Sequence, residues 1–126
     1  MSTPVALDTS ALMMPVELNV RLFDELDRLV DSSTRLVPAS VKAELERLAD
    51  GRTKEATAAS VGLDLLERCQ LRETESTYAD DAVLELALAV DAPAVTNDRA
   101  LRNRLLDAGV SVICLRGENK LELTQP

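Results

Sequence analysis

Two aspartates in this sequence follow directly after uncharged runs that are typical of buried strands. Asp8 comes after PVAL, and Asp98 comes after PAVTN. An unpaired charge is costly where its neighbours are being buried, so a carboxylate at such a point needs a partner or a task. Each aspartate also has oxygen-bearing neighbours, which are Thr9 and Ser10 in one case and Thr96 and Asn97 in the other. The pattern predicts two matched polar sites, one at each strand end.

More carboxylates begin predicted helices and can join these two sites. Glu44 lies in VKAEL, and Asp80 and Asp81 precede the apolar run AVLELALAV. Several carboxylates gathered at one place repel one another and take up protons unless a cation compensates them. Oxygen ligands favour Mg²⁺ or Mn²⁺. The expected metal ligands are Asp8, Glu44, Asp80, Asp81 and Asp98.

Composition excludes several other chemistries. The chain has no histidine, which removes Ser-His-Asp and Cys-His nucleophiles and most zinc hydrolases. Its two cysteines lack CxxC spacing, and its four glycines form no phosphate-binding loop. One Tyr, one Phe and no Trp argue against aromatic base stacking, and a net charge of −8 opposes diffuse attraction to nucleic acid. No membrane span or signal peptide is apparent, so we expect a cytoplasmic protein.

The elements that must position the acids alternate between strand and helix along the 126 residues. Strands are predicted over residues 4–8, 34–38, 71–73, 93–98 and 110–116. Helices are predicted over residues 17–31, 41–50 with Ser40 as the cap, 53–69, 82–90 and 99–109. This alternation predicts the α/β class, as one domain over residues 1–126. We expect a three-layer α/β/α sandwich with a central parallel sheet, and residues 116–126 as a C-terminal edge segment or tail.

The predicted sheet brings the two strand ends together. In open parallel sheets, ligands bind beyond the carboxyl ends of the strands. Asp8 and Asp98 both lie at such ends, so we expect them to converge. In the helix over 82–90, the apolar residues Val83, Leu84, Ala87 and Leu88 are expected to face inward. That phase favours Asp81 over Asp80 as the inward acid, because Leu84 and Leu88 follow Asp81 by three and seven residues.

Four segments, taken in order, resemble the acidic motifs of PIN-domain endoribonucleases: LDTSAL, VPASVKAEL, YADDAVLELA and VTNDRALRNRL. The resemblance covers nearly the whole chain. It is strongest to archaeal PIN proteins related to ribosomal-RNA-processing nucleases, and looser to the toxins of toxin-antitoxin pairs. It implies that Asp8, Glu44, Asp81 and Asp98 form the catalytic quartet, with Asp80 as the ambiguous residue.

The resemblance also implies a reaction and partners. One or two Mg²⁺ or Mn²⁺ ions would promote hydrolysis of RNA phosphodiester bonds, in single-stranded or structured RNA. Thr9, Ser10, Thr96 and Asn97 would hydrogen-bond the ligands, and Arg99, Arg102 and Arg116 would hold flanking phosphates. A homodimer is implied, and a ribosome-assembly factor or an antitoxin is a further expected partner.

Each assignment has a simpler alternative. Asp8 and Asp98 can serve as helix caps, Glu44 as a solvated surface residue, and one of Asp80 and Asp81 as a partner for the helix dipole. For the molecule, a catalytically silent scaffold remains open, although no member of the quartet is missing. A phosphoacceptor receiver domain fits less well, because it needs an acceptor aspartate on a mid-chain strand and a late lysine, and Lys120 is the only late one.

Overall fold

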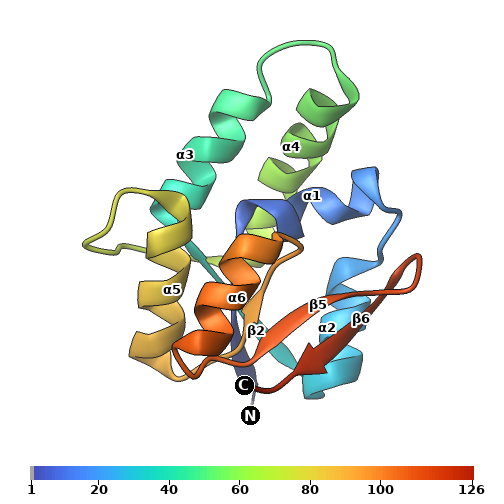
Figure 1. Ribbon diagram of the computed structural model, residues 1–126. Coiled ribbons are helices and arrows are strands. Elements are labelled where there is room, and N and C mark those ends of the chain that lie inside the picture. Colours follow the sequence, from blue (N-terminus) through green and yellow to red (C-terminus); the bar gives the residue numbers. More distant parts are fainter. Residues whose placement is uncertain (1) are drawn as a thin grey trace.

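A six-stranded sheet forms the centre of the computed structural model, which describes residues 2–126 (Figure 1). The strands are β1 (Thr3–Leu7), β2 (Ser33–Pro38), β3 (Gln70–Arg72), β4 (Ala94–Val95), β5 (Val112–Arg116) and β6 (Lys120–Thr124). The helices are α1 (Thr9–Glu17), α2 (Leu22–Val30), α3 (Ala39–Leu48), α4 (Lys54–Leu65), the 3₁₀ turn η1 (Leu66–Arg68), α5 (Ala79–Val90) and α6 (Arg99–Asp107). No helix of this part of the chain is long and apolar enough to cross a membrane.

The strand order is β3-β2-β1-β4-β5-β6. All neighbouring pairs are parallel except β5 and β6, which are antiparallel. The α/β class and the central parallel sheet are therefore confirmed, and residues 120–124 form the expected edge strand. In the register between β1 and β4, Leu7 lies opposite Val95. The residues that follow these two strands must consequently emerge side by side.

Helices cover both faces of the sheet. Helix α5 packs on β1, β2 and β4, and α6 packs on β5, whereas α2 packs on β2 and β6. Helices α3 and α4 form a hairpin that extends beyond the carboxyl edge of the sheet, with α1 against α4 (Figure 1). The central strands carry the core, since Val5, Ala6 and Leu7 are fully buried, as are Ala94 and Val95. Uncharged runs on β1 and β4 fit strands that are covered on both faces.

The first helix was not predicted. Helix α1 starts directly after Asp8, whose side chain caps it, and residues 11–14 are all buried. Four consecutive buried residues hide the helical period, and Pro15 inside the helix reads as a breaker in the sequence. The predicted helix over 17–31 begins only at Leu22. Ser40 is also not a cap, because α3 begins at Ala39 with Pro38 before it.

The inward face of helix α5 is rotated from the one predicted. Val83 and Ala87 are buried as predicted and Leu84 is half-buried, but Leu86 is buried as well and Leu88 is 53% exposed. The expectation that Leu88 faces inward is therefore wrong. The helix also starts at Ala79, one full turn before the apolar run begins. This phase decides which of the two adjacent aspartates lies on the inner side.

Helices α1 and α4 approach closely at Gly62. A Cβ atom placed there would lie 3.0 Å from the backbone oxygen of Leu12 and 3.3 Å from the side chain of Leu45. The absence of a side chain at this position is what allows the two helices to touch. Because α1 begins at Asp8, this contact fixes the helix that carries part of the site.

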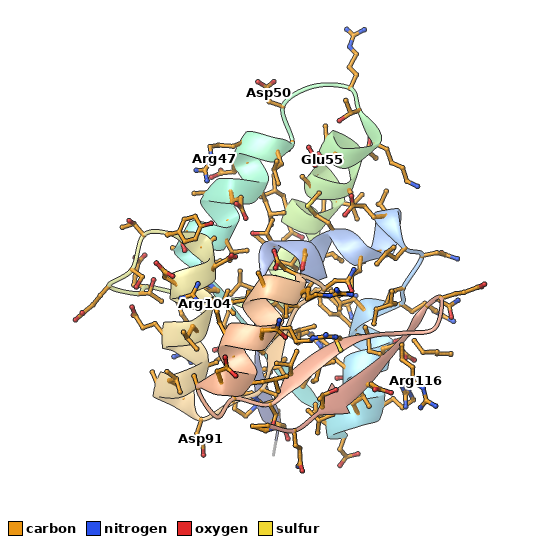
Figure 2. All side chains as sticks on the ribbon, viewed as in Figure 1. Arg47, Asp50, Glu55, Asp91, Arg104 and Arg116 are labelled. Carbon is orange, nitrogen blue, oxygen red and sulfur yellow. The ribbon has the colours of Figure 1, made fainter. Side chains whose placement is uncertain are left out.

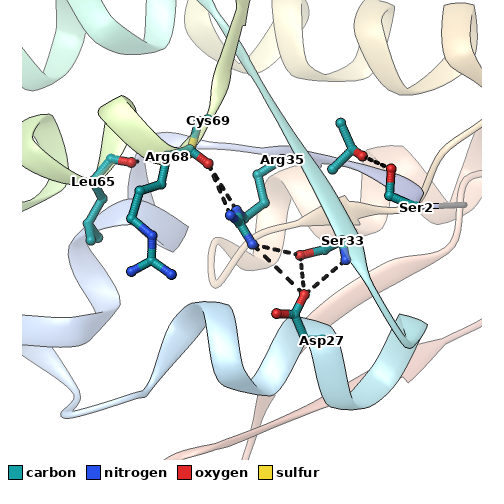
Figure 3. Close-up of polar contacts among 8 residues, drawn as sticks. Ser2, Asp27, Ser33, Arg35, Leu65, Arg68 and Cys69 are labelled. Carbon is teal, nitrogen blue, oxygen red and sulfur yellow. Dashed lines mark hydrogen bonds and ion pairs between the residues drawn. The ribbon is translucent and has the colours of Figure 1, made fainter.

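Two polar clusters tie α2 to the sheet. The buried Glu25 carboxylate accepts hydrogen bonds from Arg28 at 2.8 Å and from the backbone N–H of Leu121 on β6 at 2.9 Å. In the second cluster, Asp27 accepts two hydrogen bonds from Ser33 at the start of β2 (Figure 3). Arg35 donates to the carbonyl of Arg68 and lies 4.1 Å from the ring centre of Phe23. Both clusters lie outside the carboxyl edge and are structural.

Candidate active site at the carboxyl edge of the sheet

Asp8 is a buried carboxylate held by four hydrogen bonds. Its side chain accepts the backbone N–H of Ala11 at 2.8 Å, which caps α1. The Ser10 hydroxyl lies 2.8 and 2.9 Å from the two carboxylate oxygens, and the Thr96 hydroxyl donates from the end of β4. The residue is only 4% exposed. These contacts fix the carboxylate at the point where β1 ends.

Burial raises the pKa of Asp8 to about 6, and the charge of Asp80 adds to the rise. The hydrogen bonds from Thr96, Ala11 and Ser10 act in the opposite direction. Repulsion between carboxylates, which the sequence predicts at this site, is the smaller cause of the raised pKa. The structure gives the larger share to desolvation, because Asp8 is packed between strands and a helix. A cation would stabilise the ionised form of this side chain.

Thr96 and Asn97 join the end of β4 to the end of β1. The Thr96 hydroxyl, which donates to Asp8, accepts the backbone N–H of Asp98 at 3.0 Å. The backbone N–H of Asn97 donates to the Ser10 hydroxyl at 2.9 Å. Asp98 caps α6 by accepting the N–H of Leu101 at 3.0 Å and remains exposed. The two strand ends thus form one hydrogen-bonded unit.

The two adjacent aspartates of α5 point to different surroundings. Asp80 precedes the buried residues Val83 and Ala87 by three and seven positions, so it lies on the inner face of the helix. Burial raises the pKa of Asp80, as do the charges of Asp98 and Glu44. Asp81 is instead ion-paired with Arg104 of α6 at 2.8 Å. The structure therefore brings Asp80 near the other acids and engages Asp81 elsewhere.

Glu44 completes the acidic group from α3. It is half-buried, and its charge acts on Asp80 across the contact between α3 and α5. Of the hydroxyls expected to assist, Ser10 and Thr96 hydrogen-bond Asp8, whereas the buried Thr9 hydroxyl has no partner among residues 2–126. The acids are Asp8, Glu44, Asp80 and Asp98, one from each of four segments of the chain.

The donor set is of the right kind for a hard divalent cation. Carboxylate and hydroxyl oxygens, which hard divalent cations prefer as ligands, surround Asp8, and Cys114 lines the small cavity that contains Asp98. In the part of the chain that the structure describes, no three acidic side chains lie close enough together to hold an ion as they stand. The residues therefore fit the ion by the chemistry of their oxygen donors, while their present positions leave the carboxylates too far apart to bind it together.

The expected RNA-binding arginines fall into two groups. Arg99 and Arg102 line a small cavity of about 150 Å³ together with Asn97 and Asp98, and within residues 2–126 neither forms an ion pair. Arg116 lies apart from them at the end of β5, in the β5–β6 hairpin, where its guanidinium pairs with the Glu122 carboxylate at 3.3 Å (Figure 2). Two of the three arginines are therefore placed beside the acids.

Sequence reasoning ranked Asp80 second, although a signal for it was present. Buried helices commonly carry alanine on the side that approaches a neighbour, and Ala79, Ala82 and Ala87 mark that side of α5. The prediction turned the leucines of α5 inward ahead of the alanines. This gave the helix the wrong rotation about its axis, because Leu88 is exposed on the outer surface.

Comparisons with known proteins identify the family and the fold. Residues 5–118 match the profile of a family described as "PIN like domain". The chain is 34% identical over 116 residues to Ribonuclease VapC9 of Archaeoglobus fulgidus, covering 91% of this chain and 84% of that protein. It is 28% identical over 121 residues to Ribonuclease VapC4 of Methanocaldococcus jannaschii, covering 92% of each. The fold is similar to that of the PIN domain endonuclease Utp24, with a TM-score of 0.79 and 22% identity over 98% of this chain and 92% of that one.

Proposed function

Since the chain belongs to the PIN-like domain family, we propose that it is a divalent-metal-dependent endoribonuclease that hydrolyses RNA phosphodiester bonds. The observation that carries the proposal is the hydrogen-bonded unit of Asp8, Thr96 and Asp98, which joins two strand ends at the edge where α/β proteins bind ligands. The similarity to two proteins named as ribonucleases supports the reaction class.

We assign the acidic group to Asp8, Glu44, Asp80 and Asp98, with Asp80 in place of Asp81. Asp80 lies on the inner face of α5, and its pKa responds to two of the other acids, while Asp81 is occupied by Arg104. These four side chains would hold Mg²⁺ or Mn²⁺. When bound, such an ion supplies positive charge to the scissile phosphate and promotes deprotonation of the attacking water.

The remaining residues position the acids and the substrate. Ser10 and Thr96 fix the orientation of the Asp8 carboxylate, so that less conformational freedom is lost when it binds a cation. Arg99 and Arg102 present unpaired guanidinium groups beside Asp98, where they would bind phosphates that flank the cleaved bond. A local basic site of this kind is needed, because the net charge of −8 opposes RNA at longer range.

The experiment is cleavage of a fluorescent single-stranded RNA with Mn²⁺ and with EDTA. We expect Asp98→Asn and Asp80→Asn to reduce the rate by more than about a hundredfold. Asp81→Asn should reduce it only a few-fold, because it removes an exposed ion pair. Asp64→Asn, on the exposed surface of α4, is the matched control. If Asp98→Asn cleaved RNA as fast as the wild type, the proposal would be refuted. If Asp81→Asn lost more of the cleavage rate than Asp80→Asn, Asp81 and not Asp80 would belong to the acidic group.

Two biological roles fit this reaction. The VapC relatives, at 28% and 34% identity, favour the toxin role that the sequence resemblance suggested. The similarity to Utp24 concerns the fold alone at 22% identity, so it gives the ribosomal-RNA-processing role less support. Coexpression with the product of the neighbouring gene distinguishes the two roles: a toxin arrests growth when expressed alone and is neutralised by its partner.

A further inference from the structure

A cavity of about 330 Å³ adjoins the proposed active site on the side of α1 and α4. It is lined by Ser10, Glu17, Leu18, Lys54, Glu55 and Asn97. Its volume is within the range of small-molecule sites in proteins. Glu55 lies at the start of α4, beyond the carboxyl edge of the sheet (Figure 2). None of the proposed metal ligands lines this cavity, so it is a separate feature of the same edge.

The cavity shares two residues, Ser10 and Asn97, with the acidic site. Ser10 donates to Asp8, and the backbone of Asn97 donates to Ser10. Asn97 also lines the smaller cavity that contains Arg99 and Arg102. An RNA strand bound at Asp98 and the arginines would therefore lie next to Asn97, which also borders the larger cavity.

The side chains of the cavity are available to a ligand. Among residues 2–126, no hydrogen bond or ion pair engages the side chains of Glu17, Lys54, Glu55 or Asn97. Half-buried Leu18 supplies an apolar wall. The cavity therefore combines one apolar side with polar and charged groups that are exposed to solvent.

The chemistry favours recognition of a base at its edge. Neither Phe23 nor Tyr78, the chain's two aromatic residues, lines the cavity, so stacking on an aromatic ring is not available. Carboxylates accept hydrogen bonds from exocyclic amino groups, as acidic side chains do with the amino group of cytosine. Uracil has no amino group; its one donor on this edge, the N3–H, lies between two carbonyl oxygens, which would be repelled by the negative charges of Glu17 and Glu55.

We propose that this cavity binds the base of the nucleotide next to the scissile phosphate, and that Glu17 and Glu55 select adenine, cytosine or guanine over uracil. The inference rests on the proposed ribonuclease function, because only an RNA bound at the acidic site would place a base here. Lys54, next to the N-cap Thr53 of α4, would assist by contacting the backbone of the same nucleotide.

A binding measurement tests the cavity without relying on catalysis. We would use the Asp8→Asn variant with Mg²⁺ and fluorescent eight-nucleotide strands of oligo(C), oligo(A) or oligo(U), followed by anisotropy. We expect oligo(C) and oligo(A) to bind on the order of tenfold more tightly than oligo(U). Adding Glu17→Gln and Glu55→Gln should bring this ratio close to one. Glu67→Gln with Glu73→Gln removes the same charge from exposed positions near β3 and should leave the ratio unchanged.

Sequencing the products of a random-sequence RNA separates failure of the inference from failure of the proposed function. We expect uracil to be depleted at one position beside the cleavage site in the wild type, and this depletion to disappear in the Glu17→Gln, Glu55→Gln variant. The base-binding role would be overturned if the wild type cleaved RNA with no depletion of uracil. It would also be overturned if the preference over oligo(U) fell equally in the Glu17→Gln, Glu55→Gln variant and in the Glu67→Gln, Glu73→Gln control. Absence of cleavage with an intact binding preference would instead overturn the nuclease reaction and leave the cavity assignment in place.

Discussion

At the scale of single residues, Asp8 combines burial, helix capping and a raised pKa. The carboxylate gives up most of its contact with water and recovers only part of that loss through hydrogen bonds from Ser10, Thr96 and Ala11. Ionised Asp8 therefore destabilises the metal-free protein at neutral pH, because the folded state favours its protonated form. The proposed metal-binding role gives this unfavourable charge a use, because a bound cation would stabilise its ionised form.

Replacing Asp8 by Asn should stabilise the protein when no metal is present. Asn keeps the acceptor oxygen for the Ala11 N–H and removes the buried charge, so we expect the free energy of unfolding at pH 7.5 in EDTA to rise by roughly 1 to 3 kcal/mol. The gain should shrink between pH 6 and 4, as Asp8 of the wild type becomes protonated. Urea titrations at pH 7.5 and 5 measure both effects, with Asp50→Asn as an exposed control. A less stable Asp8→Asn variant at pH 7.5 would show that the carboxylate is needed structurally.

At the scale of elements, the contact between α1 and α4 depends on the lack of a side chain at Gly62. We expect Gly62→Ala to lower the free energy of unfolding by about 1 kcal/mol, even though alanine is the better helix former, because the new methyl group meets the backbone of Leu12 at 3.0 Å. Ser60→Ala, on the exposed side of the same helix, should be neutral or slightly stabilising. Chemical denaturation of both variants gives the comparison. A more stable Gly62→Ala would mean that α1 can move away without cost.

The edge strand β6 is held to α2 by Glu25. Its pKa is lowered to about 2, first by the hydrogen bond from Arg28 and then by the Leu121 N–H. A carboxyl group with a lowered pKa stabilises the fold above its unfolded pKa of 4.5 and loses that contribution as the pH falls toward 2. Glu25→Gln should therefore cost roughly 1.5 to 3 kcal/mol at pH 7, and less at pH 3. Urea unfolding at the two pH values measures this, and a cost that is equal at both would contradict the role of the charge.

The sequence was most informative where one pattern had one physical cause. Uncharged runs that end in an aspartate located β1 and β4, because strands covered on both faces need apolar residues throughout. Helix α1 was missed because residues 11–14 are buried on every side, so no polar face marks the helical period. The inner face of α5 was predicted wrongly for a different reason. Leu88 is large and apolar yet exposed, and only tertiary packing decides that an alanine face turns inward.

At the scale of the whole molecule, acidic residues outnumber basic ones by 22 to 14, and part of that excess is gathered at one edge of the sheet. A cation that binds there acts on the stability of the whole fold, since a ligand that binds only the folded state stabilises it. The proposed cofactor can consequently be tested by unfolding, independently of any RNA.

We expect millimolar Mn²⁺ to raise the melting temperature of the wild type. A concentration one hundred times the dissociation constant stabilises by about 2.7 kcal/mol, which corresponds to a shift on the order of 5 to 10 °C for a protein of this size. Asp80→Asn and Asp98→Asn should lose most of the shift, whereas Asp81→Asn should keep it. Differential scanning calorimetry at constant monovalent salt is the measurement. An equal shift in all variants would indicate general screening of charge instead of a site.

The two aspartates that end β1 and β4 also cap the helices that follow them, and this affects how any mutational survey of the protein should be interpreted. Alanine at either position removes both the charge and the cap, and loss of a cap costs about 1 kcal/mol. An alanine scan would therefore mix a change in stability with a change in activity: at Asp98 the lost cap lowers stability, and at Asp8 it offsets part of the gain from removing the buried charge. Asparagine, which still caps a helix, is the replacement that separates the two effects.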